Sequence, residues 1–322
     1  MKTSRIAAMV ASAVCFVGLS FAAHANPTYI TFDVPGAVDT YPVAIAGNRI
    51  AGSWYDGTTY HGFVRHANGQ FETFDVAGAT ATRATCINIS GEVAGVWVDG
   101  GSVSHGFTRS PDGSTITPFD VPGGSGAVAV TGINSTGTVV GDDILTEFFL
   151  RDSLGNLTTF SGGNGSLRIA GTINDAGYMV GTLESVGTLT TAKGLLRDPL
   201  GTITDVVVPG DSFTFASAID QNGKIGGSYS FPNLNLGFIM KPNTTFDTFA
   251  HPAASIDGGV VTGSFLNAQG HERGFIHALN GGITNVHVTG SMNTYALSIW
   301  NGKVTGNYTD SSGISHGYLR TP

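Results

Sequence analysis

The chain has 322 residues, of which 47 are glycine and only 12% are charged, and its formal net charge is −8. An acidic chain of this kind argues against nucleic acid and against an anionic membrane surface as partners, since both require basic residues. The hydrophobic fraction of 41% is too high for disorder, and the abundance of glycine is typical of an all-β protein with many tight turns.

Residues 1–25 have the features of an export signal. A basic start with Lys2 and Arg5 precedes an apolar run at 6–17, and small residues stand before a cleavage site expected near Ala25. The apolar run is short for a membrane span and no other follows, although an N-terminal anchor helix is the alternative. Cleavage would lower the formal charge to −10 by removing the two basic residues. We expect a secreted or periplasmic protein without a membrane span.

After such a cleavage Cys86 would be the only cysteine, so no intrachain disulfide is expected. Its place beside Ile87 in a predicted inner strand indicates a small core residue and not a nucleophile.

An internal repeat with spacings of 37 to 46 residues runs through the chain from residue 26 onward, and three columns count the same seven units. Such spacings are typical of four-stranded blades. The first column is an isoleucine before a turn: Ile45, Ile87, Ile133, Ile173, Ile219, Ile256 and Ile299. The second is a glycine seven or eight residues later: Gly52, Gly95, Gly141, Gly181, Gly227, Gly263 and Gly306. The third is a Gly-aromatic pair or its equivalent, beginning at Gly62, Gly106, Phe148, Gly194, Gly237, Gly274 and Gly317.

The second unit, residues 83–122, shows the expected strands of one blade. Short apolar runs rich in valine, isoleucine, threonine and aromatic residues alternate with turn signals at 90–91 and 111–113. The strands are predicted at 84–89, 93–99, 105–110 and 115–121. Nothing after residue 25 has a convincing helical period.

The two ends of the repeat complement one another. The segment YITFDV at 29–34 matches the fourth strands FETFDV at 71–76 and ITPFDV at 116–121, while HGYLR at 316–320 matches a third strand. If the units close into a ring, the N-terminal strand completes the last blade and covers its edge. We predict a seven-bladed β-propeller that occupies residues 26–322 as a single domain.

Two residues after the glycine column, six units carry a large side chain, which neighbouring blades would need for stacking. We interpret these residues as structural wedges and not as platforms for sugars: Trp54, Trp97, Leu183, Tyr229, Phe265 and Tyr308.

The repeats carry recurring motifs: VVG at 139–141, HGFVR at 61–65, HGFTR at 105–109 and HGYLR at 316–320. With these motifs the chain resembles the bacterial extracellular repeats of the HAF family, with Gly and Arg where that family has Ala and Trp. The resemblance covers essentially all of residues 26–322. It implies export and a repeat fold, and it implies no activity and no catalytic residues.

Three histidines occupy one slot of the repeat. His61, His105 and His316 each follow an aspartate that ends the preceding strand, namely Asp56, Asp99 and Asp310. Three imidazoles in successive units could hold a metal or act as acid and base. Because the pairs recur locally, we favour a structural role in which each aspartate accepts a hydrogen bond from its own histidine.

Unit three departs from the pattern with the sequence GDDILTEFF. Asp143 takes the wedge position and Glu147 the histidine slot, next to Asp142, and unit four adds Glu184. Together with His105, these are the candidate catalytic residues. Carboxylates in adjacent blades could cleave a glycosidic bond, and Asp142 and Asp143 could bind Ca²⁺. A solvated acidic loop is the plainer alternative.

In a propeller the loops between second and third strands and the links between blades share one face, the usual ligand face. Four aromatic residues near this face could stack on sugar rings: Tyr41, Phe213, Phe215 and Tyr295. The pattern favours a monomeric, non-catalytic propeller that binds an extracellular polysaccharide or a surface protein. Two alternatives stay open: a polysaccharide lyase or glycoside hydrolase using the same face, and a structural or adhesive envelope protein. An enzyme would place titratable side chains of units two to four in one pocket, whereas a binding module would place aromatic side chains round the rim.

Overall fold

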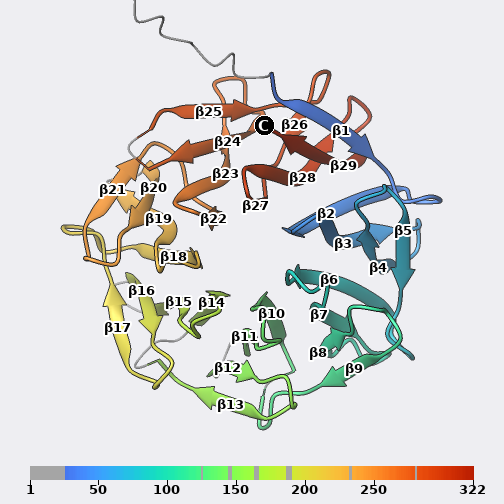
Figure 1. The fold of residues 1–322 in the computed structure, drawn as a ribbon, viewed down its shortest axis with the longest axis horizontal. Coiled ribbons are helices and arrows are strands. Elements are labelled where there is room, and N and C mark those ends of the chain that lie inside the picture. The colour runs from blue at the N-terminus through green and yellow to red at the C-terminus, as the bar shows by residue number, and fades with distance from the viewer. Residues whose placement is uncertain are drawn as a thin grey trace, which may run out of the picture.

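The computed structural model describes residues 26–322 except for 125, 144–146, 163–166, 186–190, 232–233 and 280. The expected export signal, residues 1–25, lies outside the described residues. The described residues form seven antiparallel sheets arranged as blades round a central axis, so the predicted seven-bladed β-propeller is confirmed (Figure 1). Within this described part, no helix is long and apolar enough to span a membrane.

Blades one to three each have four strands in chain order, the first nearest the axis (Figure 1). Blade one contains β2 (Asp39–Ala46), β3 (Arg49–Tyr55), β4 (Tyr60–Arg65) and β5 (Phe71–Phe74). Blade two contains β6 (Ala81–Ile87), β7 (Val93–Val98), β8 (Ser104–Arg109) and β9 (Ile116–Phe119). Blade three contains β10 (Val128–Ile133), β11 (Val139–Asp143), β12 (Glu147–Arg151) and β13 (Leu157–Phe160).

Blades four to six repeat this arrangement. Blade four contains β14 (Leu167–Ile173), β15 (Met179–Ser185), β16 (Thr191–Arg197) and β17 (Ile203–Val206). Blade five contains β18 (Thr214–Ile219), β19 (Ile225–Phe231), β20 (Leu234–Met240) and β21 (Phe246–Phe249). Blade six contains β22 (Ser255–Asp257), β23 (Val260–Leu266), β24 (Glu272–Ala278) and β25 (Ile283–Val286).

Blade seven joins the two ends of the described chain. Its inner strand is split into β26 (Asn293–Thr294) and β27 (Ser298–Trp300), followed by β28 (Lys303–Thr309), β29 (Ser315–Thr321) and, outermost, β1 (Thr28–Phe32). β1 pairs with β29 in antiparallel register, from Thr28 opposite Thr321 to Phe32 opposite Gly317. The predicted closure by the N-terminal strand is therefore confirmed.

The glycine column has a steric cause, which blade two illustrates. A Cβ atom built on Gly95 would lie 2.1 Å from the backbone carbonyl oxygen of Arg83 on the neighbouring inner strand. At this point the register of β6 against β7 shifts between Ala84 and Cys86, as in a β-bulge. Any larger residue at position 95 would push the two strands apart.

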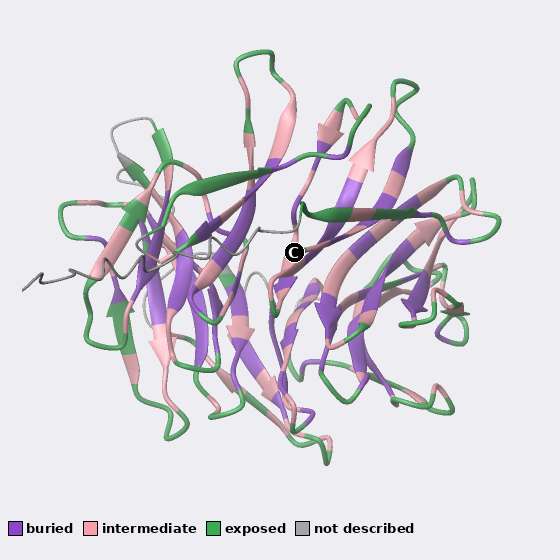
Figure 2. Ribbon diagram, turned by 45° about the horizontal axis from the view of Figure 1, so that its top comes forward, coloured by how far each residue is buried: buried purple, intermediate pink, exposed green. Residues whose placement is uncertain are grey.

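The core lies between adjacent blades, where buried strand segments face one another, whereas the connections are exposed (Figure 2). Most of the isoleucine column belongs to this core; Ile45, for example, is 5% exposed. Trp54 and Trp97 pack against it, which supports their interpretation as wedges. Cys86 is buried as expected, and burial raises the pKa of its thiol to about 12, so that it stays protonated.

A column of arginines connects four pairs of blades. In five blades an arginine is the last or second-last residue of the third strand. In four of these blades the guanidinium stacks on a phenylalanine in the fourth strand of the preceding blade. Such contacts combine cation–π attraction with apolar burial. The stacked pairs are Arg65 on Phe32, Arg109 on Phe74, Arg151 on Phe119 and Arg197 on Phe160, at 4.8, 4.8, 5.0 and 4.9 Å from the ring centroids.

A ladder of buried amides connects the turns that follow the isoleucine column. The side-chain N–H of Asn88 donates to the backbone carbonyl of Asn134 at 3.0 Å. Asn134 donates in the same way to Asn174, and Asn174 to Asp220, both at 3.2 Å. These bonds tie blades two to five together on the face opposite to the loops between second and third strands.

Candidate functional site

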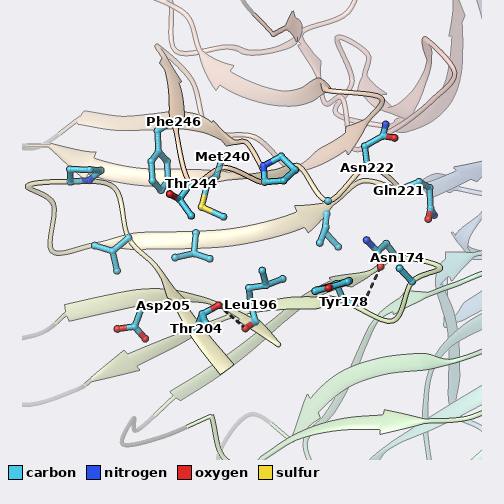
Figure 3. Close-up of a pocket in the computed structure, with 17 residues that line it drawn as sticks. Asn174, Tyr178, Leu196, Thr204, Asp205, Gln221, Asn222, Met240, Thr244 and Phe246 are labelled. Carbon is cyan, nitrogen blue, oxygen red and sulfur yellow. Dashed lines mark hydrogen bonds between the residues drawn. The ribbon is translucent and has the colours of Figure 1, made fainter. Parts of the chain in front are cut away.

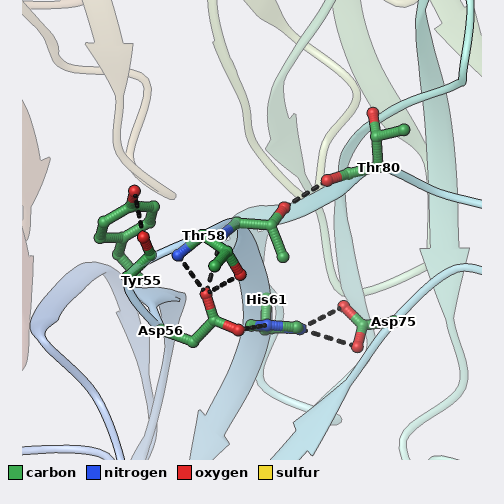
Figure 4. A network of polar contacts seen from close by, with 8 residues as sticks. Tyr55, Asp56, Thr58, His61, Asp75 and Thr80 are labelled. Atoms are coloured by element: carbon green, nitrogen blue, oxygen red, sulfur yellow. Dashed lines mark hydrogen bonds and ion pairs between the residues drawn. The ribbon is translucent and has the colours of Figure 1, made fainter.

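The connections between second and third strands and the links from one blade to the next share one face of the ring, which we call the loop face. In blade one, the hydroxyl of Thr59, before β4, donates a hydrogen bond to the carbonyl of Thr80, in the link to blade two (Figure 4). This juxtaposition was expected for a propeller. It places most of the residues singled out from the sequence on one side of the molecule.

His61 lies between two carboxylates on this face (Figure 4). Its Nε2 is 3.3 Å from Oδ2 of Asp56, which is the contact predicted from the sequence. Its Nδ1 is 2.8 Å from Oδ2 of Asp75, which follows the fourth strand of the same blade. Asp56 is itself fixed, because its Oδ1 accepts backbone hydrogen bonds from Thr58 and Thr59 at 2.6 and 2.8 Å.

The same three-residue arrangement recurs in blades two and seven. The predicted partners lie near Nε2 and a second aspartate lies near Nδ1 in each case. Nε2 of His105 is 3.5 Å from the carboxylate of Asp99, and its Nδ1 is 2.5 Å from that of Asp120. Nε2 of His316 is 3.6 Å from the carboxylate of Asp310, and its Nδ1 is 3.0 Å from that of Asp33. The second aspartate was missed from the sequence, although it is the Asp of the repeated FDV motif at 32–34, 74–76 and 119–121.

Each of these imidazoles also stacks on the wedge residue of its own blade. The ring centroids are 4.6 Å apart for His61 and Trp54, 4.4 Å for His105 and Trp97, and 5.0 Å for a third pair, His316 and Tyr308. Stacking and two carboxylate contacts hold each ring at its own blade. The described residues contain no group of three or more His, Cys, Asp or Glu side chains that could hold a metal ion.

The carboxylates raise the pKa of two of these histidines. Burial alone would lower the pKa of His61, but its hydrogen bonds to Asp75 and Asp56 outweigh this effect and the pKa is raised. For His105 the hydrogen bond to Asp120 is the main cause of the raised pKa. The positive form of both rings is therefore favoured in the folded protein.

Asp142, in β11 of blade three, is buried and contacts blade four. Its Oδ2 accepts a hydrogen bond from the backbone N–H of Ala170 at 2.7 Å. Burial, and to a smaller extent the charge of Asp143, raises the pKa of Asp142 to about 6. Hydroxyl groups make the corresponding bond in two other blades: Thr182 with the N–H of Ala216 at 3.1 Å and Ser264 with the N–H of Ala296 at 3.0 Å.

Asp143 faces the other side of β11, as successive strand residues do. It is fully buried, and its Oδ2 lies 2.2 Å from the position of a Cβ atom built on Gly124, in the link from blade two. Glu147 stands opposite Asp143 in the register of β11 and β12. Glu184 lies in β15 of blade four and is half-buried. A calcium site at Asp142 and Asp143 stays a prediction.

A cluster of tyrosines lies at the loop face of blade one and was only partly found from the sequence. The ring of Tyr60 is 6.1 Å from that of Tyr41 and 5.1 Å from that of Tyr55, and the guanidinium of Arg83 lies 3.9 Å from its centroid. We call these four residues the tyrosine patch. The tyrosine rings are half-buried and Arg83 is exposed. The signal in the sequence was the pair of tyrosines that flank the loop in YDGTTY, residues 55–60.

The other predicted binding residues lie on inner strands or links of different blades. Phe215 in β18 stands opposite Ser228, as Tyr41 stands opposite Ser53, so both aromatics occupy one slot of the repeat. Tyr295, between β26 and β27, lines a small cavity of about 270 Å³. Phe213, in the link to blade five, forms a bridge with Ala192 of blade four. All three are half-buried and distributed over blades five and seven.

No protein-family model matches the chain, and no curated protein matches it. Solved structures with a similar fold include a streptogramin B lyase, with 10% identity over 91% of this chain and 97% of that one, at a TM-score of 0.62. A virginiamycin B lyase from Staphylococcus aureus has 11% identity over 92% and 100%, with a TM-score of 0.62. An oligogalacturonate lyase in complex with manganese has 13% identity over 92% and 96%, with a TM-score of 0.60. At these identities the likeness concerns the propeller fold alone.

Proposed function

We propose that the protein is a non-catalytic binding propeller that holds an extracellular polysaccharide on the tyrosine patch of blade one. The observation that carries this proposal is the grouping of three half-buried tyrosine rings with an exposed arginine on the loop face. Aromatic faces stack on the C–H surfaces of sugar rings, and phenol and guanidinium groups can bond to sugar hydroxyls.

The surroundings of the patch suit a polar, uncharged ligand. Tyr55 donates its hydroxyl to the carbonyl of Gly57 at 2.9 Å, which fixes that ring beside the loop. Thr58 and Thr59 supply hydroxyls near it, and the carboxylates of Asp56 and Asp75 are engaged by His61. A rigid arrangement of this kind lowers the entropy lost when a ligand binds.

The positions of the acidic candidates favour binding over catalysis. Asp142 and Asp143 face opposite sides of one strand, and both are at most 2% exposed. A glycoside hydrolase needs two carboxyl groups that flank the same bond. The histidines, in turn, are engaged one by one in their own blades, at the same place in three successive repeats.

Binding can be tested on a glycan array with the protein from residue 26 onward, followed by titration of any hit. We expect Tyr60→Ala to weaken binding roughly two- to tenfold, since stacking of this kind contributes about 0.5–1.5 kcal/mol. Leu200→Ala is the control, because Leu200 is 92% exposed on a turn of the opposite face. Equal binding by the wild type and Tyr60→Ala would refute the patch, and shortened products from an incubated polysaccharide would support the lyase or hydrolase alternative.

We further propose that the protein acts outside the cytoplasm, as the features of residues 1–25 and the resemblance to HAF repeats suggest. The test is expression of the full chain in a bacterial host with N-terminal sequencing of the exported fraction. A first residue of Asn26 is expected. Retention of the full-length chain in the cytoplasm would refute export.

A further inference from the structure

A cleft of about 740 Å³ lies between blades four and five (Figure 3). It opens among turns on the face opposite to the tyrosine patch. Its walls come from the turns that follow the first and third strands and from the outer strands of both blades. Leu196 and Val206 belong to blade four, whereas Met240 and Phe246 belong to blade five. The volume is in the usual range for a small-molecule site.

The cleft occurs where the Arg–Phe column is interrupted on both sides. Register places Met240 of β20 in the position that Arg65, Arg109, Arg151 and Arg197 occupy in other blades. In blade four, Val206 of the fourth strand is paired with Gly194 of the third strand. Earlier blades have a phenylalanine at this position of the fourth strand. The guanidinium and the ring that meet between blades three and four are thus both missing here.

The lining indicates an uncharged ligand. Among the described residues that line it, only Asp205 carries a formal charge; its carboxylate is paired with Nζ of Lys193 at 2.9 Å and lies at the outer end. The middle of the cleft is apolar, with Leu196 facing Met240 across it (Figure 3). At the inner end stand amide side chains, of which Gln221 is one.

The inner walls are held in place by hydrogen bonds between the blades. The amide of Asn174 donates to the carbonyl of Asp220 at 3.2 Å, and its Oδ1 accepts the N–H of Tyr178 at 3.0 Å. Gln221 accepts the N–H of Asp175 through Oε1 at 2.9 Å. Because both turns are fixed to one another, the cleft is formed before any ligand arrives.

We propose that this cleft is a second binding site, for an uncharged, elongated small molecule with an aromatic or branched alkyl body and a hydrogen-bonding end. The body lies between Leu196 and Met240, and the polar end reaches the amides near Gln221. This site is independent of the tyrosine patch, because the two lie on opposite faces of the ring.

The probe for this proposal is N-phenyl-1-naphthylamine, an uncharged aromatic amine whose fluorescence increases in apolar surroundings. We expect saturable binding of one molecule per chain. The variant Val206→Phe with Met240→Arg introduces the Arg–Phe pair found at four other interfaces and fills the cleft. It should weaken probe binding roughly tenfold or more, because a filled cleft excludes the naphthalene ring. The matched control Leu154→Arg adds the same charge at a residue that is 87% exposed, and it should bind as the wild type does.

Thermal unfolding of each variant shows whether it is folded. If the double variant does not fold, Val206→Phe alone carries the test, since phenylalanine occupies this position in five other blades. Unchanged affinity in the folded filling variant would overturn the proposal, as would the absence of saturable one-to-one binding by the wild type. Loss of binding in the filling variant but not in Leu154→Arg would support it.

Discussion

The carboxylate of Asp142 in blade three bonds to the backbone N–H of Ala170 in blade four, at 2.7 Å. In blade four the neutral hydroxyl of Thr182 makes the corresponding bond to blade five. A hydroxyl is therefore sufficient for this contact, and the carboxylate adds a titratable group to a buried interface. Asp142 thus makes the stability of the ring depend on pH.

We predict that Asp142→Thr stabilises the protein at neutral pH. The folded-state pKa of Asp142 is about 6, above the ordinary value of 3.8, so its favourable contribution is present below about pH 4 and is lost as the pH rises through 6. The variant should exceed the wild type in free energy of unfolding by up to about 3 kcal/mol at pH 7.5, and by much less at pH 4. Urea unfolding at pH 4, 6 and 7.5 measures this, and parallel pH profiles would contradict it.

His105→Ala should lower stability slightly and should leave ligand binding unchanged. The loss of stacking on Trp97 costs about 0.5–1.5 kcal/mol. Because the pKa of His105 is raised, its ionic contribution is full below the ordinary value of 6.5 and disappears as the pH rises through the folded value. The melting temperature should therefore fall more at pH 5.5 than at pH 9. If elemental analysis found a metal in the wild type and not in the variant, His105 would belong to a metal site, and the structural role would be wrong.

Asn134→Asp should weaken the contact between blades three and four. The substitution removes the amide donor to Asn174 and places a carboxylate beside a carbonyl, with an expected cost of about 1–3 kcal/mol. Asn68→Asp is the control, since Asn68 lies in an exposed turn, where water can replace the hydrogen bond that its amide donates to Gln70. Equal denaturant midpoints for the two variants would argue against the amide ladder as a stabilising element.

Deletion of residues 26–34 should destabilise the ring by several kcal/mol, because it removes β1 and exposes the edge of β29. The ring of Phe32, which is stacked by Arg65, would be lost with it. Calorimetry and size-exclusion chromatography are the measurements. A truncated protein with the melting temperature and the elution volume of the longer chain would not fit a ring closed by this strand.

The fold could be predicted from the sequence because its information is local and repeated. Ile87 and Gly95 recur at similar spacings in every unit, and Gly106 recurs in every unit except the third, where Phe148 takes its place. The strands predicted for unit two agree with β6 to β9 to within three residues. The contact between Asp56 and His61 was also predicted, since only the two strands of one hairpin are involved.

The stacked arginines and the amide ladder between blades were not predicted, because they join residues from different units. Arg109 reaches Phe74 of the preceding blade, and neither residue indicates its partner when one unit is read alone. The cleft near Met240 could be recognised only after the structure showed the Arg–Phe column and its interruption between blades four and five. Tyr60 was missed although its partners Tyr41 and Tyr55 lie in the same blade; only its contact with Arg83 of the next blade depends on the closed ring.

The pairing of β1 with β29 also governs the order in which the protein can fold. Thr28 is among the first residues of the propeller to leave the ribosome, and its partner Thr321 is among the last. Contacts that span nearly the whole chain form slowly, because a large loop must close before they contribute. The central blades can pair their strands during synthesis, while β1 must wait unpaired until β29 has been synthesised.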